Sequence, residues 1–76
     1  MTKGEIRVGV TFNPSGDPLV AELKAAAAQL IDLIDRIVDE TDAGMPMPER
    51  RRLKAIAQTA TEEAAMWAVK AATKEC

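Results

Sequence analysis

The sequence has no histidine and no tyrosine, and it contains a single serine (Ser15) and a single cysteine (Cys76). These absences exclude Ser–His and Cys–His nucleophilic catalysis, as well as histidine-rich metal sites. One cysteine cannot form an internal disulfide, and we assign Cys76 no role. These absences disfavour an enzyme, and we expect neither a metal nor another cofactor.

The sequence also lacks long apolar runs and a large excess of charge of either sign. No run approaches the roughly 20 residues of a membrane span and no signal-peptide core is found, which predicts a soluble protein of the cytoplasm. The 10 Lys and Arg against 12 Asp and Glu give a net charge of −2, whereas a duplex-DNA binder needs a broad basic surface. A small anionic ligand is compatible with this charge, because a few converging cations suffice to bind it.

The N-terminal segment alternates between apolar and polar side chains from Ile6 to Phe12. Because a period of two is typical of extended chain, the pattern predicts an extended arm. Residues 13–18 contain two prolines, a glycine and short polar side chains, which predicts a turn. Asp17 is expected to cap a helix whose first residue is Pro18. The arm and the turn together should span residues 1–17.

Two long helices are predicted after this turn, over residues 18–40 and about residues 48–73. The apolar seam of the first steps by three or four positions: Val20, Leu23, Ala27, Leu30, Ile34 and Ile37. The seam of the second is mostly alanine: Leu53, Ala57, Ala60, Ala64, Trp67 and Ala71. Gly44 and Pro46 mark a short connection between them. The predicted fold class is all-α, a single domain with an antiparallel helical hairpin over residues 18–76.

Each predicted helix carries an apolar stripe wider than one partner helix can cover. Residues outside the two seams widen these stripes: Leu19, Ala26, Ile31, Leu33, Val38, Ile56, Met66 and Val69. A chain of 76 residues buries only about 60% of its unfolded surface, so it has no large core of its own. We therefore expect several hairpins to assemble into a homo-oligomer.

Charges of opposite sign gather near the predicted connection. The first helix ends with acidic side chains and the second begins with basic ones: Asp32, Asp35, Asp39 and Glu40, then Arg50, Arg51 and Arg52. Each set opposes the dipole of its own helix, but the neighbouring ends of an antiparallel hairpin allow the two sets to pair. We favour ion pairs within or between hairpins over an anion-binding role for the arginines. A metal site is disfavoured because nothing supplies a convergent set of carboxylates.

Three residues form the candidate ligand site. Phe12 offers a flat apolar face, Asn13 an amide that both donates and accepts, and Lys24 a long cation nearly two turns into the first helix. Together these side chains are suited to holding a base and a phosphate, but an ordinary contact between arm and helix would also bring them together. Trp67, on the alanine-rich seam, is interpreted as a packing anchor rather than a stacking platform.

A wider pattern resembles a known family. It comprises Phe12-Asn13-Pro14, the basic residue of Lys24-Ala25-Ala26, Pro48-Glu49-Arg50, Ala57, and Glu62-Glu63-Ala64-Ala65-Met66-Trp67-Ala68 followed by Lys74. Over residues 11–74, the chain resembles the helical-hairpin sponges with which bacteriophages defeat the CBASS defence. That fold is shared in part with the anti-Thoeris sponges.

The resemblance implies a hexamer of hairpins in the host cell cytoplasm. It would sequester cyclic dinucleotides at subunit interfaces and, in some members, cyclic trinucleotides at a second type of pocket. By the same resemblance, Phe12 would stack on a base and Lys24 would meet a phosphate, while Lys74 matches a basic position of the trinucleotide pocket. Phe12 stands where the family usually has tyrosine, and Ala26 where it has a polar residue, so dinucleotide binding is the firmer expectation.

Two other classes of function are compatible with the sequence. One is a helical-hairpin module that binds or regulates another protein and has no nucleotide ligand. The other is an enzyme that uses carboxylates and Lys24, which we rank last because no acid is paired with a positioned base.

Overall fold

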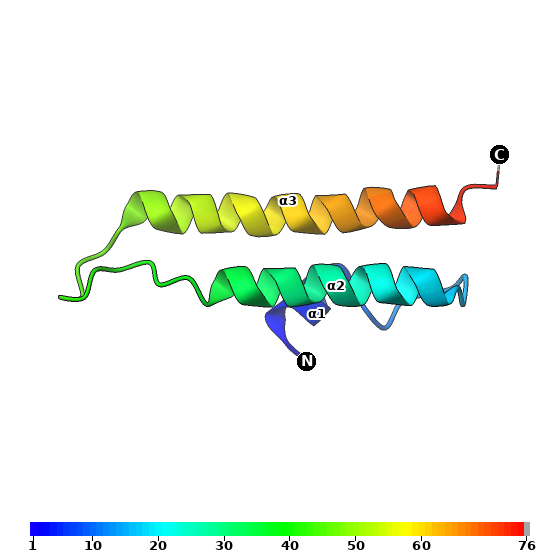
Figure 1. The fold of residues 1–76 in the computed structure, drawn as a ribbon, viewed down its shortest axis with the longest axis horizontal. Helices are drawn as coiled ribbons and strands as arrows, with labels where there is room; N and C mark the ends of the chain where they lie inside the picture. Colours follow the sequence, from blue (N-terminus) through cyan, green and yellow to red (C-terminus); the bar gives the residue numbers. More distant parts are fainter. Residues whose placement is uncertain (76) are drawn as a thin grey trace.

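The computed structural model describes residues 1–75, and the chain folds into three helices. The helices are α1 (Lys3–Val8), α2 (Pro18–Asp35) and α3 (Pro48–Thr73). The two long helices α2 and α3 run antiparallel side by side, and the short α1 lies against α2 (Figure 1). The all-α hairpin is confirmed, and Cys76 lies outside the described residues. Within residues 1–75, no helix is both long enough and apolar enough to cross a membrane.

The N-terminal segment is helical where the sequence predicted an extended arm, so that prediction is wrong. Thr2 and Glu5 form a capping box, in which the Thr2 hydroxyl accepts from the Glu5 N–H (3.1 Å) and the Glu5 carboxylate accepts from the Thr2 N–H (2.8 Å). Gly9 ends α1 in the left-handed region, at φ 73°. The two caps stabilise a helix here although the apolar pattern favours a strand, because they satisfy backbone groups at both ends of the helix.

The start of α2 agrees with the prediction and its end does not. The Asp17 carboxylate accepts from the Leu19 N–H (2.9 Å), and Pro18 occupies the first turn. The helix ends at Asp35, whereas the sequence predicted residue 40. Beyond it the chain turns back, and an isolated antiparallel bridge joins Glu40 to Pro46. The Lys54 ammonium of α3 donates to the carbonyl oxygens of Asp35 (3.3 Å) and Ile37 (2.5 Å), which satisfies acceptors at and just beyond the end of α2.

The core between the long helices is narrow. Its buried apolar residues are Val20, Ala28, Ile31 and Ala65. The predicted seam of α2 is right at Val20 but wrong at Leu30 and Ile37, which are each 47% exposed.

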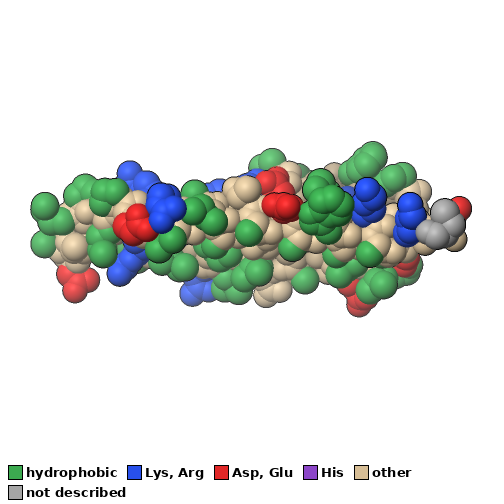
Figure 2. All heavy atoms as spheres, turned by 90° about the horizontal axis from the view of Figure 1, so that it is seen from above, with side chains coloured by type: hydrophobic (Ala, Val, Ile, Leu, Met, Phe, Trp, Pro, Cys, Tyr) green, Lys and Arg blue, Asp and Glu red, His purple; other side chains and the backbone are tan. Residues whose placement is uncertain are grey.

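The predicted seam of α3 mostly faces outward instead of toward α2, although Ala57 within it is half-buried. Trp67 is 55% exposed and Leu53 51%, while Ala60 and Ala64 are also exposed. The inward face carries Gln58, which is buried. Its amide donates to the carbonyl oxygen of Ile31 (3.0 Å), and this hydrogen bond compensates for the loss of water. We call the outward residues Leu53, Ile56, Ala60, Ala64, Trp67 and Ala71 the outer stripe of α3. Hydrophobic side chains lie at intervals along the face seen in Figure 2.

Candidate functional site

Three of the predicted site residues line one hollow near the start of α2 and the end of α3. The hollow has a volume of about 250 Å³ and contains Phe12, Asn13 and Lys24. The sequence did not single out the other lining residues: Pro14, Ser15, Val20, Val69 and Thr73. Val69 and Thr73 stand four positions apart, so they share a face of α3. This spacing was the only available signal that they would line the hollow.

Phe12 presents its ring at the surface of this hollow. The residue is 71% exposed, and the Lys24 ammonium lies 5.4 Å from the ring centroid. The backbone of Phe12 is held in the loop by a hydrogen bond from its N–H to the carbonyl oxygen of Gly9 (3.0 Å). An aromatic face that is held in place and open on one side is suited to stacking on a planar ligand.

Lys24 is buried, unlike most lysines, at 8% exposure. Its ammonium donates to the carbonyl oxygens of Gly9 (3.1 Å) and Phe12. These two contacts pin the loop between α1 and α2 onto the side of α2. An ammonium has three N–H donors, and these two hydrogen bonds use two of them.

Asn13 uses both ends of its amide within the loop. Its Nδ2 donates to the carbonyl oxygen of Asp17 (3.1 Å), and its Oδ1 accepts from the Ser15 hydroxyl (2.6 Å). The Asp17 N–H in turn donates to Ser15 Oγ (3.1 Å). Asn13 therefore shapes the loop that carries Phe12, and the structure adds this role to the ligand contact expected from the sequence.

Lys74 is not among the residues that line the hollow. It is exposed and follows the last turn of α3, where its N–H donates to the carbonyl oxygen of Ala71. Its neighbour Thr73 does line the hollow. Within one chain, the structure therefore brings together Phe12, Asn13 and Lys24 but leaves Lys74 outside.

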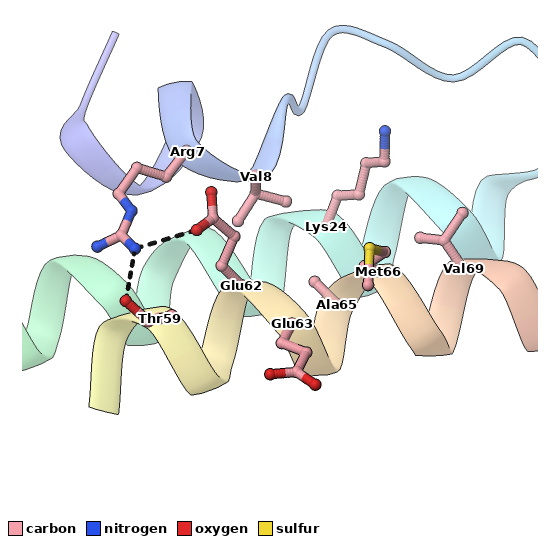
Figure 3. A pocket seen from close by; sticks show the side chains of 9 residues that line it. All are labelled: Arg7, Val8, Lys24, Thr59, Glu62, Glu63, Ala65, Met66 and Val69. Atoms are coloured by element: carbon pink, nitrogen blue, oxygen red, sulfur yellow. Dashed lines mark hydrogen bonds and ion pairs between the residues drawn. The ribbon is translucent and has the colours of Figure 1, made fainter. Parts of the chain in front are cut away.

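A larger hollow of about 520 Å³ adjoins the first, because Lys24 and Val69 line both. It lies between α1 and α3 (Figure 3). At one end the Arg7 guanidinium donates to Glu62 (3.0 Å) and to the hydroxyl of Thr59 (3.3 Å). The sequence missed Arg7 because its segment was interpreted as an extended arm.

The charges near the connection make local contacts. Arg51 pairs with Asp39 (3.3 Å), Arg52 pairs with Glu49, and Arg50 donates to the carbonyl oxygen of Val38 (2.9 Å). This supports the interpretation as structural ion pairs. Of the other predicted acidic partners, Asp32 and Asp35 instead contact α1, and Glu40 forms a backbone bridge with Pro46. Throughout residues 1–75, no group of three or more His, Cys, Asp or Glu side chains is placed to hold a metal ion.

Trp67 is not a packing anchor within the hairpin. Its indole N–H donates to Glu63 (3.3 Å), and the Lys70 ammonium lies 5.4 Å from its ring. Both partners are on α3 itself, so the ring remains on the outer stripe.

Comparison with known proteins identifies the family. The chain matches the family described as Acb2/Tad1, hairpin domain, over residues 2–73, which is nearly its whole length. This is the family of anti-CBASS and anti-Thoeris sponges, proteins that bind nucleotides without transforming them, and the match confirms the resemblance. No curated protein and no solved structure matches the chain. By the extent of the family match, the chain belongs to the Acb2/Tad1 hairpin-domain family of nucleotide sponges.

Proposed function

We propose that this chain sequesters cyclic dinucleotides and thereby blocks CBASS-type signalling in the cytoplasm of a phage-infected host. The observation that carries this proposal is the pairing of an exposed aromatic face, Phe12, with a buried cation, Lys24, in one hollow. A sponge must hold its ligand and release it unchanged. The hollow supplies contacts for binding and no paired acid and base for catalysis.

The chemistry of the hollow suits a base joined to a phosphate. A base stacked on Phe12 would gain a sequence-tolerant contact that typically contributes about 1–3 kcal/mol. A phosphate oxygen near Lys24 would receive a charge-assisted hydrogen bond from the remaining N–H. Because the ammonium is held 5.4 Å from the ring centroid, both contacts fall within the span of one nucleotide.

The exposed apolar surface supports assembly into a homo-oligomer, and the family suggests a hexamer. Trp67, Leu53 and Ile56 are each more than half exposed on the outer stripe of α3. On the other long helix, Leu30 and Leu33 are each 47% exposed. A chain this small gains from covering such surface with copies of itself. In an assembly, Lys74 of one chain would approach a pocket between chains, which is the place we propose for a cyclic trinucleotide.

The proposal is tested by calorimetric titration of the purified protein with a panel of cyclic dinucleotides and cyclic trinucleotides. We expect Phe12→Ala to weaken dinucleotide binding by roughly 5- to 150-fold through lost stacking. Phe12→Tyr is the matched control, because it keeps the ring and should bind within a few-fold of the unaltered chain. The ring is 71% exposed, so neither change should lower the melting temperature by more than a few degrees.

Two outcomes would count against this function. If the unaltered protein binds no cyclic nucleotide of the panel, the sponge proposal fails for this chain and a protein-interaction module becomes the better explanation. If Phe12→Ala melts early but binds normally, Phe12 serves the fold rather than the ligand.

A further inference from the structure

Helix α1 approaches α2 more closely than any residue other than glycine allows. Gly4 is buried in this contact. A Cβ atom at this position would lie 2.0 Å from the carbonyl oxygen of Ala28 and 2.9 Å from the Asp32 carboxylate. The carbonyl belongs to the backbone of a long helix, so it cannot move aside as the end of a flexible side chain would. Any side chain at position 4 must therefore push α1 away from α2.

The close approach is matched by a hydrogen bond. The Gly4 N–H donates to Oδ1 of Asp32 at 2.8 Å. N–H groups in the first turn of a helix have no partner within that helix, so Asp32 satisfies one of them from a neighbouring element. The bond is possible only because the backbone of Gly4 lies directly against α2.

The remaining contacts of α1 are mainly polar and near the surface. Lys3 pairs with Asp35 (2.9 Å) and Arg7 pairs with Glu62 (3.0 Å), which ties α1 to both long helices. Ile6, a large apolar residue of α1, is 65% exposed. Exposed ion pairs contribute little individually. The contact at Gly4 therefore contributes most to the docking of α1, and the ion pairs add to it.

The position of α1 is transmitted to Phe12 through Gly9. The Gly9 N–H donates to the carbonyl oxygen of Glu5 (3.0 Å), which anchors Gly9 to the end of α1. The carbonyl oxygen of Gly9 then accepts from the Phe12 N–H (3.0 Å) and from the Lys24 ammonium (3.1 Å). One carbonyl group thus joins α1 to both residues that are expected to meet the nucleotide.

We infer that Gly4 is a positioning residue for the nucleotide site, because its close contact with Ala28 and Asp32 docks α1 and so places Phe12 and Lys24. This inference rests on the proposed function. When α1 detaches, the Gly9 carbonyl leaves its place and the two ligand contacts are no longer arranged together. The apparent affinity then falls in proportion to the fraction of molecules in which α1 is docked.

The test is Gly4→Ala, measured first without any ligand. Alanine is a better helix former than glycine, so a loss of α1 cannot be ascribed to a weaker helix. We expect the amides of α1 to lose protection against hydrogen exchange, while those of α2 and α3 keep theirs. Gly44→Ala is the control for a strained glycine substitution elsewhere: Gly44 has φ 79°, which disfavours alanine, but it lies in the distant connection and against no other helix, so protection of α1 should not change.

The second measurement is calorimetric titration with cyclic di-GMP and 3′,3′-cyclic GMP–AMP. We expect Gly4→Ala to raise the Kd by roughly 10- to 100-fold, which corresponds to α1 being docked in about 1–10% of molecules. Gly44→Ala should leave the Kd within about threefold. Saturating nucleotide should also restore protection to α1 in Gly4→Ala, because binding and docking favour each other reciprocally.

Asp32 supplies an independent pair of variants. Asp32→Asn keeps an oxygen that accepts from the Gly4 N–H and should retain most of the affinity, whereas Asp32→Ala removes the acceptor and should weaken binding. Normal α1 protection in Gly4→Ala, or an unchanged Kd despite lost protection, would overturn the positioning role and leave the proposed function intact. If the unaltered protein binds neither nucleotide, nor any other cyclic dinucleotide, the proposed function fails and the positioning role fails with it.

Discussion

The ammonium of Lys24 lies 5.4 Å from the centroid of the Phe12 ring and donates a hydrogen bond to the carbonyl oxygen of the same residue. The charge that is expected to meet a phosphate therefore also holds the loop that presents the aromatic face. Ligand binding and loop structure depend on one side chain. From the sequence, Lys24 was compatible with either a ligand contact or an ordinary contact between arm and helix, and its burial against the loop shows that it serves the fold.

This double role predicts the effect of Lys24→Met, which keeps most of the aliphatic stem but removes every donor. We expect cyclic-dinucleotide binding to weaken by roughly 10- to 150-fold, because a hydrogen bond to a charged group contributes about 1.5–3 kcal/mol. Calorimetry measures this change, and hydrogen exchange should show faster exchange at the Phe12 N–H. Lys70→Met, at an exposed lysine over Trp67, should change neither quantity. Unchanged binding in Lys24→Met would contradict the assignment.

Two adjacent alanines of α3 should respond differently to enlargement. Ala65 is 7% exposed between the long helices, so Ala65→Leu should lower the free energy of unfolding by about 1–3 kcal/mol through overpacking. Ala64 faces outward, and Ala64→Leu should leave the hairpin itself nearly unaffected. Chemical denaturation of both variants at low protein concentration separates them. Equal losses of stability would mean that the hairpin register is wrong.

The outer stripe of α3 is expected to lie between chains in the assembly. Trp67→Glu should therefore reduce the oligomer mass measured by multi-angle light scattering, because a buried carboxylate without a partner is strongly unfavourable. The protomer mass is 8.2 kDa, so loss of even one subunit is resolvable. Met45→Glu, at an exposed residue of the connection between α2 and α3, is the control and should keep the wild-type mass. A wild-type protein that is a stable monomer would refute the assembly.

Acid should weaken the docking of α1. Hydrogen bonds from Lys3 and then Gln58 hold the pKa of Asp35 below its ordinary value of 3.8. A carboxyl group whose pKa is lowered on folding contributes stability above its unfolded pKa and loses it as the pH falls through the folded value. Protection of α1 amides should therefore begin to decline below about pH 4.5, because hydrogen bonds with Thr2 lower the pKa of Glu5 in the capping box from 4.5, and should decline further below about pH 3.8 as Asp35 protonates. Asp35→Asn keeps an acceptor without the titration, so the decline should be smaller, and an identical profile would exclude Asp35 as its cause.

Much of the fold was determined by short-range signals in the sequence. Asp17 and Pro18 start α2, and Pro48 starts α3, because the residues that begin a helix act on backbone groups within one turn. The absence of histidine, with only one serine and one cysteine, likewise excluded Ser–His and Cys–His catalysis and histidine-rich metal sites, whatever the fold. The three residues that the sequence proposes for the ligand site, Phe12, Asn13 and Lys24, also line one hollow.

The tertiary structure decided what depends on contacts between distant residues. The outer stripe of α3 has the stronger apolar pattern, yet the opposite face is the buried one, and there the Gln58 amide donates to the carbonyl oxygen of Ile31. Gly4 gives no sign in the sequence of the role it has against Ala28 and Asp32. Such hydrogen bonds and close backbone contacts join residues that are far apart in the sequence, so they depend on how the helices pack. Periodicity reports only how polar each face of a single helix is.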